Sequence, residues 1–155
     1  MRTALLLTMW LGFAASATAD QQFEFAPFEI PEGGRIVVPV GEGDALHGIA
    51  AMIDKRTRGA LTVAAREATF VGEAGTTLTL RGISPYSRID LIGTGSETLT
   101  RAAAEDFGGT ASALLGDTLG GSVHILWPDE NIDAEATAAR VAFGYKLRSY
   151  RFDGY

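Results

Sequence analysis

The chain has 155 residues, of which 46% are hydrophobic, and this size and composition predict one globular domain able to bury an apolar core. Its formal net charge of −6, from 13 basic and 19 acidic residues, argues against a nucleic-acid partner, because contacts to phosphates require a basic surface. The lack of cysteine in the sequence excludes disulfides, thiol catalysis and cysteine-ligated zinc.

The first nineteen residues have the pattern of a secretory signal peptide. Arg2 gives a positive start, residues 4–15 form an uncharged apolar run, and Ala17-Thr18-Ala19 resembles a small-x-small cleavage site. The run is shorter than the ~20 residues that span a bilayer, which leaves a permanent anchor as the weaker alternative. We therefore expect cleavage after Ala19, a periplasmic or secreted product, and no stable membrane anchor in the mature chain.

Strand and helix patterns alternate along the first half of the mature chain. The aromatic stretch from Phe23 to Phe28 contains Pro27 and predicts an extended entry at an edge, because proline cannot donate a ladder hydrogen bond. Residues 35–40 (RIVVPV) predict a strand buried on both faces. Asp44 is the predicted N-cap of a first helix, and residues 57–70 are predicted to be largely helical.

The longest predicted helix carries two glycines in its interior. It follows the predicted strands 76–80 and 87–92, and Ser96 is its predicted N-cap. Its apolar stripe over residues 97–115 runs through Gly108-Gly109. Because an interior glycine costs a helix ~1 kcal/mol, we expect a neighbouring backbone to lie close to this pair.

The last predicted elements are a strand over residues 122–127 (SVHILW) and a helix that Asp133 caps and that reaches Leu147. This helix carries an apolar stripe formed by Ala138, Val141, Ala142 and Tyr145. Strands that alternate with helices predict βαβ units with right-handed crossovers. The expected fold class is therefore α/β, with a three-layer arrangement of a mixed sheet and helices on both of its faces.

The end of the chain, from Leu147 onward, combines aromatic and basic side chains. In an extended conformation Tyr150 and Phe152 would share one face, and two exposed rings at a chain end are usually docked on a surface. The tail then either folds back on its own domain or binds a partner. Arg140, Lys146, Arg148 and Arg151 form a basic cluster that is either a solvated helix end or a docking patch for acidic residues of a partner domain.

A helix leading into the sequence GYKLRSYRFDGY is similar to the stretch that joins the N-terminal domain to the catalytic domain in leucyl aminopeptidases, the cytosol aminopeptidase family. Phe25-Ala26-Pro27, residues 70–75 (FVGEAG) and residues 88–95 (RIDLIGTG) follow in the order of that N-terminal domain. The resemblance implies a macro-domain-like fold over residues 20–147. It also implies that residues 148–155 are a tail resembling the linker to a catalytic domain that this chain lacks.

The same resemblance implies that this chain carries no catalytic residue, no metal ligand and no cofactor. In this family the catalytic domain holds two divalent metals, zinc or manganese, and the enzyme is a hexamer. The expected role here is a non-catalytic interaction or assembly module, either a natural stand-alone domain or a truncated gene product. Its expected partner is a separately encoded aminopeptidase catalytic domain or a further copy of itself, and its candidate docking residues are Arg148, Tyr150, Arg151 and Phe152.

Residues 131–136 (NIDAEA) resemble the start of the family's metal-binding signature, Asn-Thr-Asp-Ala-Glu-Gly. Ile132 and Ala136 depart from that signature, and the segment precedes the tail instead of lying far beyond it. Asp133 as a helix N-cap, with Glu135 in the first turn, explains the same residues by capping and the helix dipole. We therefore interpret this segment as the start of a helix.

Gly93, Thr94, Gly95 and Ser96 form a second candidate site, for an anion. They follow a predicted strand and open a predicted helix, where backbone N–H groups can bind a phosphate. A macro-like fold makes nucleotide or ADP-ribose binding the alternative function by analogy, although no lysine or arginine adjoins the segment. His47 and His124 are too far apart in the sequence to support a site.

Overall fold

The computed structural model describes residues 23–43, 45–96, 100–116, 122–127 and 134–149. The expected signal peptide and the tail residues Tyr150, Arg151 and Phe152 lie outside these ranges. The elements in chain order are β1 (Gly34–Gly41), α1 (Gly48–Arg56), α2 (Ala60–Glu67), β2 (Thr77–Arg81), β3 (Tyr86–Gly95), α3 (Arg101–Leu115), β4 (His124–Ile125) and α4 (Ala134–Ser149).

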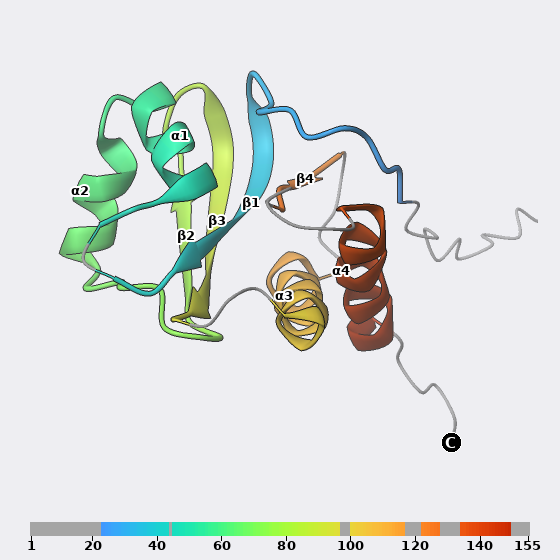
Figure 1. The fold of residues 1–155 in the computed structure, drawn as a ribbon. Coiled ribbons are helices and arrows are strands. Elements are labelled where there is room, and N and C mark those ends of the chain that lie inside the picture. The colour runs from blue at the N-terminus through green and yellow to red at the C-terminus, as the bar shows by residue number, and fades with distance from the viewer. Residues whose placement is uncertain (1–22, 44, 97–99, 117–121, 128–133, 150–155) are drawn as a thin grey trace, which may run out of the picture.

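The strands form one mixed sheet in the order β2-β3-β1-β4 (Figure 1). β1 is parallel to both β3 and β4, and β2 is antiparallel to β3. Residues 36–40 of β1 are all buried, as their continuous apolar run predicts for a strand with both faces covered. Pro39 has no N–H to donate and lies past Val37, the last residue of β1 that pairs with β4.

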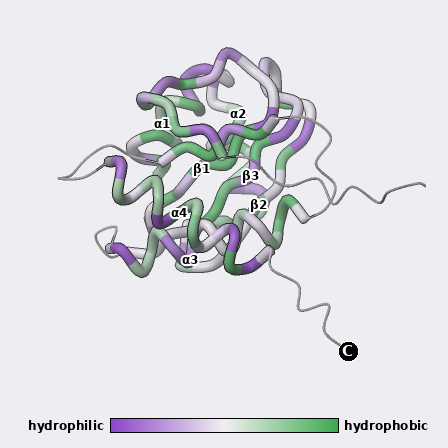
Figure 2. Tube along the Cα trace, turned by 90° about the vertical axis from the view of Figure 1, so that its right-hand side faces the viewer, coloured by the Kyte–Doolittle hydropathy of each residue, from purple (hydrophilic) through white to green (hydrophobic). Residues whose placement is uncertain are grey.

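Helices cover both faces of the sheet, which confirms the predicted three-layer α/β fold (Figure 1). On one face, α1 and α2 pack on alternate residues of β1 and β3, and the buried cluster includes Ile36, Val38, Val40, Ile53, Leu61, Ile89 and Leu91. On the other face, α3 and α4 form a second cluster that includes Val37, Ile92, Phe107, Leu115, Val141 and Tyr145. Figure 2 shows the same separation, with hydrophobic strand segments lying between the helices.

Two helix starts differ from the predictions. α1 begins after His47, which is extended and makes no side-chain cap, so the predicted cap at Asp44 is wrong; Asp44 itself lies outside the described residues. The N-cap of α3 is Thr100 and not Ser96, and the Thr100 hydroxyl accepts a hydrogen bond of 3.2 Å from the Ala103 amide. The reason is that β3 continues through Gly95, which postpones the start of the helix.

The last strand is shorter than predicted. β4 comprises two residues, whereas a strand over residues 122–127 was expected. Across the described ranges, no helix combines the length and the apolar character needed to cross a bilayer.

Candidate interaction site on α4

The inner face of α4 is fixed against α3. Val141 and Tyr145, two members of the predicted apolar stripe, are buried in the cluster that α3 shares with the sheet. Gly108 of α3 and Gly144 of α4 sit where a side chain would collide with the backbone of the opposite helix. The predicted close approach at the glycine pair is therefore confirmed for Gly108, and the sequence reasoning missed the matching role of Gly144.

The opposite face of α4 carries large apolar side chains in contact with solvent. Phe143 is 53% exposed and Leu147 is 66% exposed. Ala136 and Ala139 are exposed as well and recur with them at helical spacing. We call Ala136, Ala139, Phe143 and Leu147 the outer face of α4. An exposed pair of large apolar residues on one helix is a candidate contact surface.

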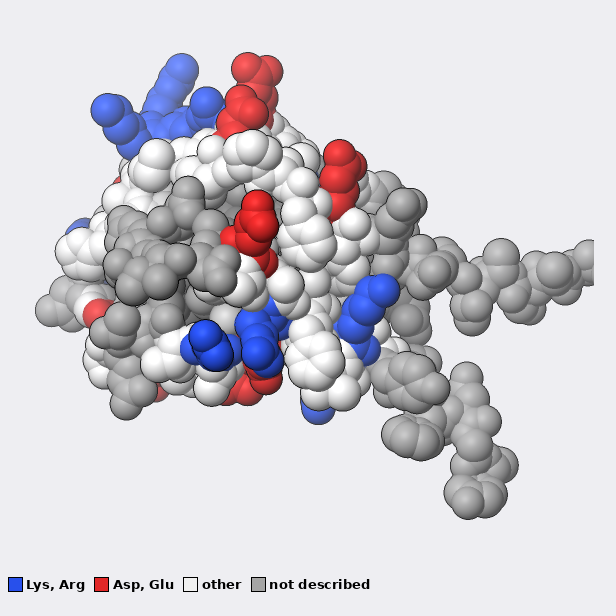
Figure 3. Space-filling view, turned by 45° about the vertical axis from the view of Figure 1, so that its right-hand side comes forward, with Lys and Arg blue, Asp and Glu red and all other residues white. Residues whose placement is uncertain are grey.

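Charged side chains border the outer face. Glu135 lies in the first turn of α4, and Lys146 and Arg148 lie in the last turn, where each sign of charge suits the helix dipole. Arg140 is paired with Glu105 of α3, with 2.8 Å between guanidinium nitrogen and carboxylate oxygen. Figure 3, in which the α4 side of the molecule comes forward, shows basic side chains, some of them beside acidic ones, with uncharged surface between the groups.

Of the predicted docking residues, the structure places Arg148 as an exposed residue of α4, because the helix extends through Ser149. Tyr150, Arg151 and Phe152 lie outside the described residues, so docking by the tail stays a prediction.

The stretch from Phe23 to Pro31, which precedes β1, contacts the rest of the domain at both of its ends. Phe23 makes an edge-to-face contact with Tyr145 of α4, with 5.3 Å between ring centroids, and the Lys146 ammonium lies 5.8 Å from the centroid of Phe23. At the other end, the Pro31 carbonyl accepts hydrogen bonds from Arg56 (2.7 Å) and from the Tyr86 hydroxyl (2.9 Å). Residues 23–31 form neither a helix nor a strand. Their contact with α4 was not predicted, because no local pattern pairs residues this far apart.

The glycine-containing segment at residues 93–96 does not lie at a helix N-terminus. Gly93, Thr94 and Gly95 belong to β3, and α3 begins at Arg101. The Gly93 amide donates to the Thr76 carbonyl (2.8 Å), and the Gly95 amide donates to the Gly72 carbonyl (3.0 Å). These two donors are engaged with the chain itself, and anion binding by this segment stays a prediction that a thermal-shift titration with ADP-ribose can test.

The reason for glycine at position 93 is packing against the preceding loop. A Cβ at this position would lie 2.0 Å from the Glu73 carbonyl oxygen. The two glycine-rich segments at residues 70–75 and 88–95 are therefore one packed unit in the fold.

A buried ion pair on the α3 side of the sheet was not predicted from the sequence. Nε of Arg88 and Oδ2 of Asp90 lie 2.7 Å apart without the alignment of a hydrogen bond. The other carboxylate oxygen of Asp90 accepts hydrogen bonds from Arg88 (3.0 Å) and from the Thr79 hydroxyl (2.5 Å). Arg88 also donates to the Leu114 carbonyl at the end of α3 (3.1 Å), so the pair links the helix to the sheet.

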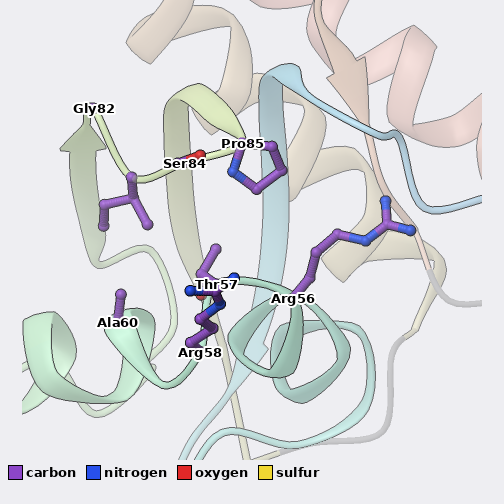
Figure 4. Close-up of a pocket in the computed structure, with 8 residues that line it drawn as sticks. Arg56, Thr57, Arg58, Ala60, Gly82, Ser84 and Pro85 are labelled. Atoms are coloured by element: carbon purple, nitrogen blue, oxygen red, sulfur yellow. The ribbon is translucent and has the colours of Figure 1, made fainter.

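An open hollow of about 550 Å³ lies between the α1–α2 turn and the β2–β3 loop (Figure 4). The side chain of Arg56 is directed away from Ser84 and Pro85 (Figure 4), and its guanidinium donates to the carbonyls of Ile30 and Pro31. The start of α2 beside the hollow is already capped, because Asp54 accepts hydrogen bonds from the Thr62 amide and hydroxyl. Arg56 and Asp54 beside this hollow are thus used within the fold.

Half of the segment that resembles a metal signature, residues 131–133, lies outside the described residues, which resume at Ala134. Glu135 is exposed in the first turn of α4. Elsewhere His47 is exposed at the start of α1, and His124 is exposed in β4. Among the residues that the structure describes, no three His, Asp or Glu side chains gather as metal ligands.

The order of elements and the packed glycine segments can be compared with known proteins. The family model described as "Cytosol aminopeptidase family, N-terminal domain" matches residues 37–155. The chain belongs to the cytosol aminopeptidase family. This confirms the resemblance that the sequence segments indicated.

Relatives of this cytosol aminopeptidase family member are considerably longer. A "Probable cytosol aminopeptidase" of Caulobacter vibrioides is 33% identical over 140 residues, which cover 86% of this chain and 27% of the relative. A mutant of tomato leucine aminopeptidase has a similar fold, with a TM-score of 0.61 and 22% identity over 77% of this chain and 26% of that chain. The chain thus spans about a quarter of the length of these relatives and corresponds to the family's N-terminal domain.

Proposed function

We propose that this chain is a non-catalytic interaction and assembly module of a leucyl-aminopeptidase-like protein. The observation that carries the proposal is the family match over residues 37–155, which is to an N-terminal domain and not to an aminopeptidase as a whole. The two-metal chemistry of such an enzyme requires several converging carboxylates on a pair of ions. We propose that those residues, with their zinc or manganese ions, belong to a separate catalytic domain.

The interaction role is supported by the outer face of α4. Two large apolar side chains that are more than half exposed cost solvation free energy when they remain in water. The inner face of the same helix is held firmly by α3, so the outer face is presented on a rigid support. A rigid apolar surface with a charged border is typical of protein interfaces.

We also propose that the chain is exported, on the basis of the pattern in residues 1–19. Intact-mass measurement of protein recovered from the periplasm of a bacterial host is expected to give a chain that begins at Asp20. A chain that keeps residues 1–19 in the cytosol would contradict export.

The proposed lack of catalysis is tested with leucine p-nitroanilide and added manganese. We expect the purified chain to give no hydrolysis above the buffer rate. Hydrolysis that a chelator abolishes would overturn the proposal. Co-expression with the catalytic region of the Caulobacter relative then tests the module role, and we expect either co-purification with that region or self-association of the chain.

A further inference from the structure

We propose that the outer face of α4 binds the same face of a second copy of this chain, with the two helices antiparallel. This inference names a partner for the assembly role and therefore rests on the proposed function.

Large and small residues occupy opposite halves of the outer face. Phe143 and Leu147 lie in the second half of α4, and Ala136 and Ala139 lie in the first half. When two copies of the helix run antiparallel, the large residues of one come level with the small residues of the other. Side chains then fit into the gaps left by alanine, as in other close helix pairs.

Charge is also self-complementary in this arrangement. Glu135 and Lys146 are separated by three helical turns and so lie on the same flank of α4. A two-fold axis across an antiparallel pair brings that flank of one helix beside the same flank of the other, which places Glu135 of each copy next to Lys146 of its partner. A parallel pair would bring this flank of one helix beside the opposite flank of the other, so the match between Glu135 and Lys146 would be lost.

The remaining charges near the outer face do not oppose the pair. Arg140 would approach its own counterpart near the two-fold axis, but each Arg140 is already paired with Glu105 of its own chain at 2.8 Å. Lys146 lies over the ring of Phe23 and still remains exposed, so it can reach a carboxylate of the second copy.

The expected association is weak. One face of a 16-residue helix is smaller than the roughly 1,200–2,000 Å² buried in a stable interface. We therefore expect a concentration-dependent dimer with a Kd on the order of 10 to 100 µM.

Sedimentation velocity on the full chain, as the host processes it, tests the pair over a concentration range that brackets this Kd. Wild-type protein is expected to shift from monomer to dimer with rising concentration. Phe143→Glu and Leu147→Glu are each expected to weaken the dimer at least about tenfold. The matched control is Val63→Glu, because Val63 is a 60% exposed apolar residue of α2 on the opposite side of the sheet, and it should leave the dimer unchanged.

A charge exchange tests the orientation of the helices. Glu135→Lys and Lys146→Glu are each expected to weaken the dimer several-fold, because each puts equal charges together. The double variant is expected to recover most of the wild-type affinity. A double variant as weak as the single ones would overturn the antiparallel pairing.

Failure of this inference differs from failure of the proposed function. A chain that stays monomeric throughout, or a dimer that Phe143→Glu and Leu147→Glu leave intact, overturns the α4 pair. Neither result affects the lack of peptidase activity or binding to an aminopeptidase catalytic region, which are measured separately.

Discussion

Gly108 of α3 and Gly144 of α4 each leave room for the backbone of the opposite helix. A Cβ at Gly108 would lie 2.0 Å from the carbonyl oxygen of Val141, and a Cβ at Gly144 would lie 2.0 Å from that of Glu105. Backbone atoms of a packed helix cannot swing aside as the end of a side chain can. This reciprocal contact sets the depth of α4 in the fold and thereby decides which residues form its outer face.

Gly108→Ala and Gly144→Ala are therefore expected to destabilise the domain. Each added methyl group must push the two helices apart, which costs about 1–3 kcal/mol or more of the free energy of unfolding. Urea denaturation followed by circular dichroism measures this loss.

The matched control is Gly109→Ala in the next position of α3. A Cβ there would meet its nearest atom, the Gly144 carbonyl oxygen, at 3.7 Å, which is an ordinary contact. Because alanine is the better helix former, this variant is expected to be neutral or more stable by up to ~1 kcal/mol. Equal destabilisation by all three variants would contradict the reciprocal fit.

Asp90 and Arg88 are expected to behave as a coupled pair. Asp90 is 1% exposed, so Arg88→Met leaves a buried carboxylate without its counter-charge, and we expect a loss of about 3–5 kcal/mol. Asp90→Leu is expected to cost a similar amount by leaving Arg88 unpaired. In a double-mutant cycle measured by urea denaturation, the double variant should lose less than the sum of the single variants. Additive losses would show that the two side chains act independently.

The contact of Phe23 with α4 is expected to stabilise the fold. Phe23→Ala removes the edge-to-face contact with Tyr145 and the ring beneath Lys146, so we expect a loss of about 1–2 kcal/mol in the free energy of unfolding. Phe25→Ala is the control, because Phe25 is 60% exposed and its loss should cost less than about 0.5 kcal/mol. Similar effects of the two changes in thermal unfolding would argue against the contact.

Thr69 is expected to be a point where glycine improves stability. This β-branched residue has a φ of 53° at the end of α2, where the Phe70 amide donates to the Ala65 carbonyl (2.8 Å). Thr69→Gly relieves a backbone conformation that side chains disfavour and should raise the free energy of unfolding by about 0.5–1 kcal/mol. Ala68→Gly, at an ordinary helical φ of −84°, should lower it by a similar amount. A loss of stability in the Thr69 variant would refute the explanation.

Hydrophobic patterns along the chain were sufficient to predict the layers of the fold. The apolar run at residues 35–40 predicted a buried strand, and residues 36–40 are buried. The stripe through Val141 and Tyr145 predicted a buried helix face, and both residues are buried. The cap at Asp44 and the cap at Ser96 were wrong, because helix starts depend on where the preceding strand or loop ends. The outer face of α4 was not foreseen, since Phe143 and Leu147 could have faced another element.

The sequence by itself determined the α/β class, the family and the acidic balance of charge, because these follow from periodicity, ordered segments and composition. Only the tertiary structure decided which residues meet across the fold: Gly108 with Val141, Phe23 with Tyr145, and Arg88 with Leu114. The physical reason is that periodicity specifies which face of an element is apolar, whereas the packing of that element against its neighbours specifies which face remains in solvent. The exposure of Phe143 and Leu147 is a property of that packing.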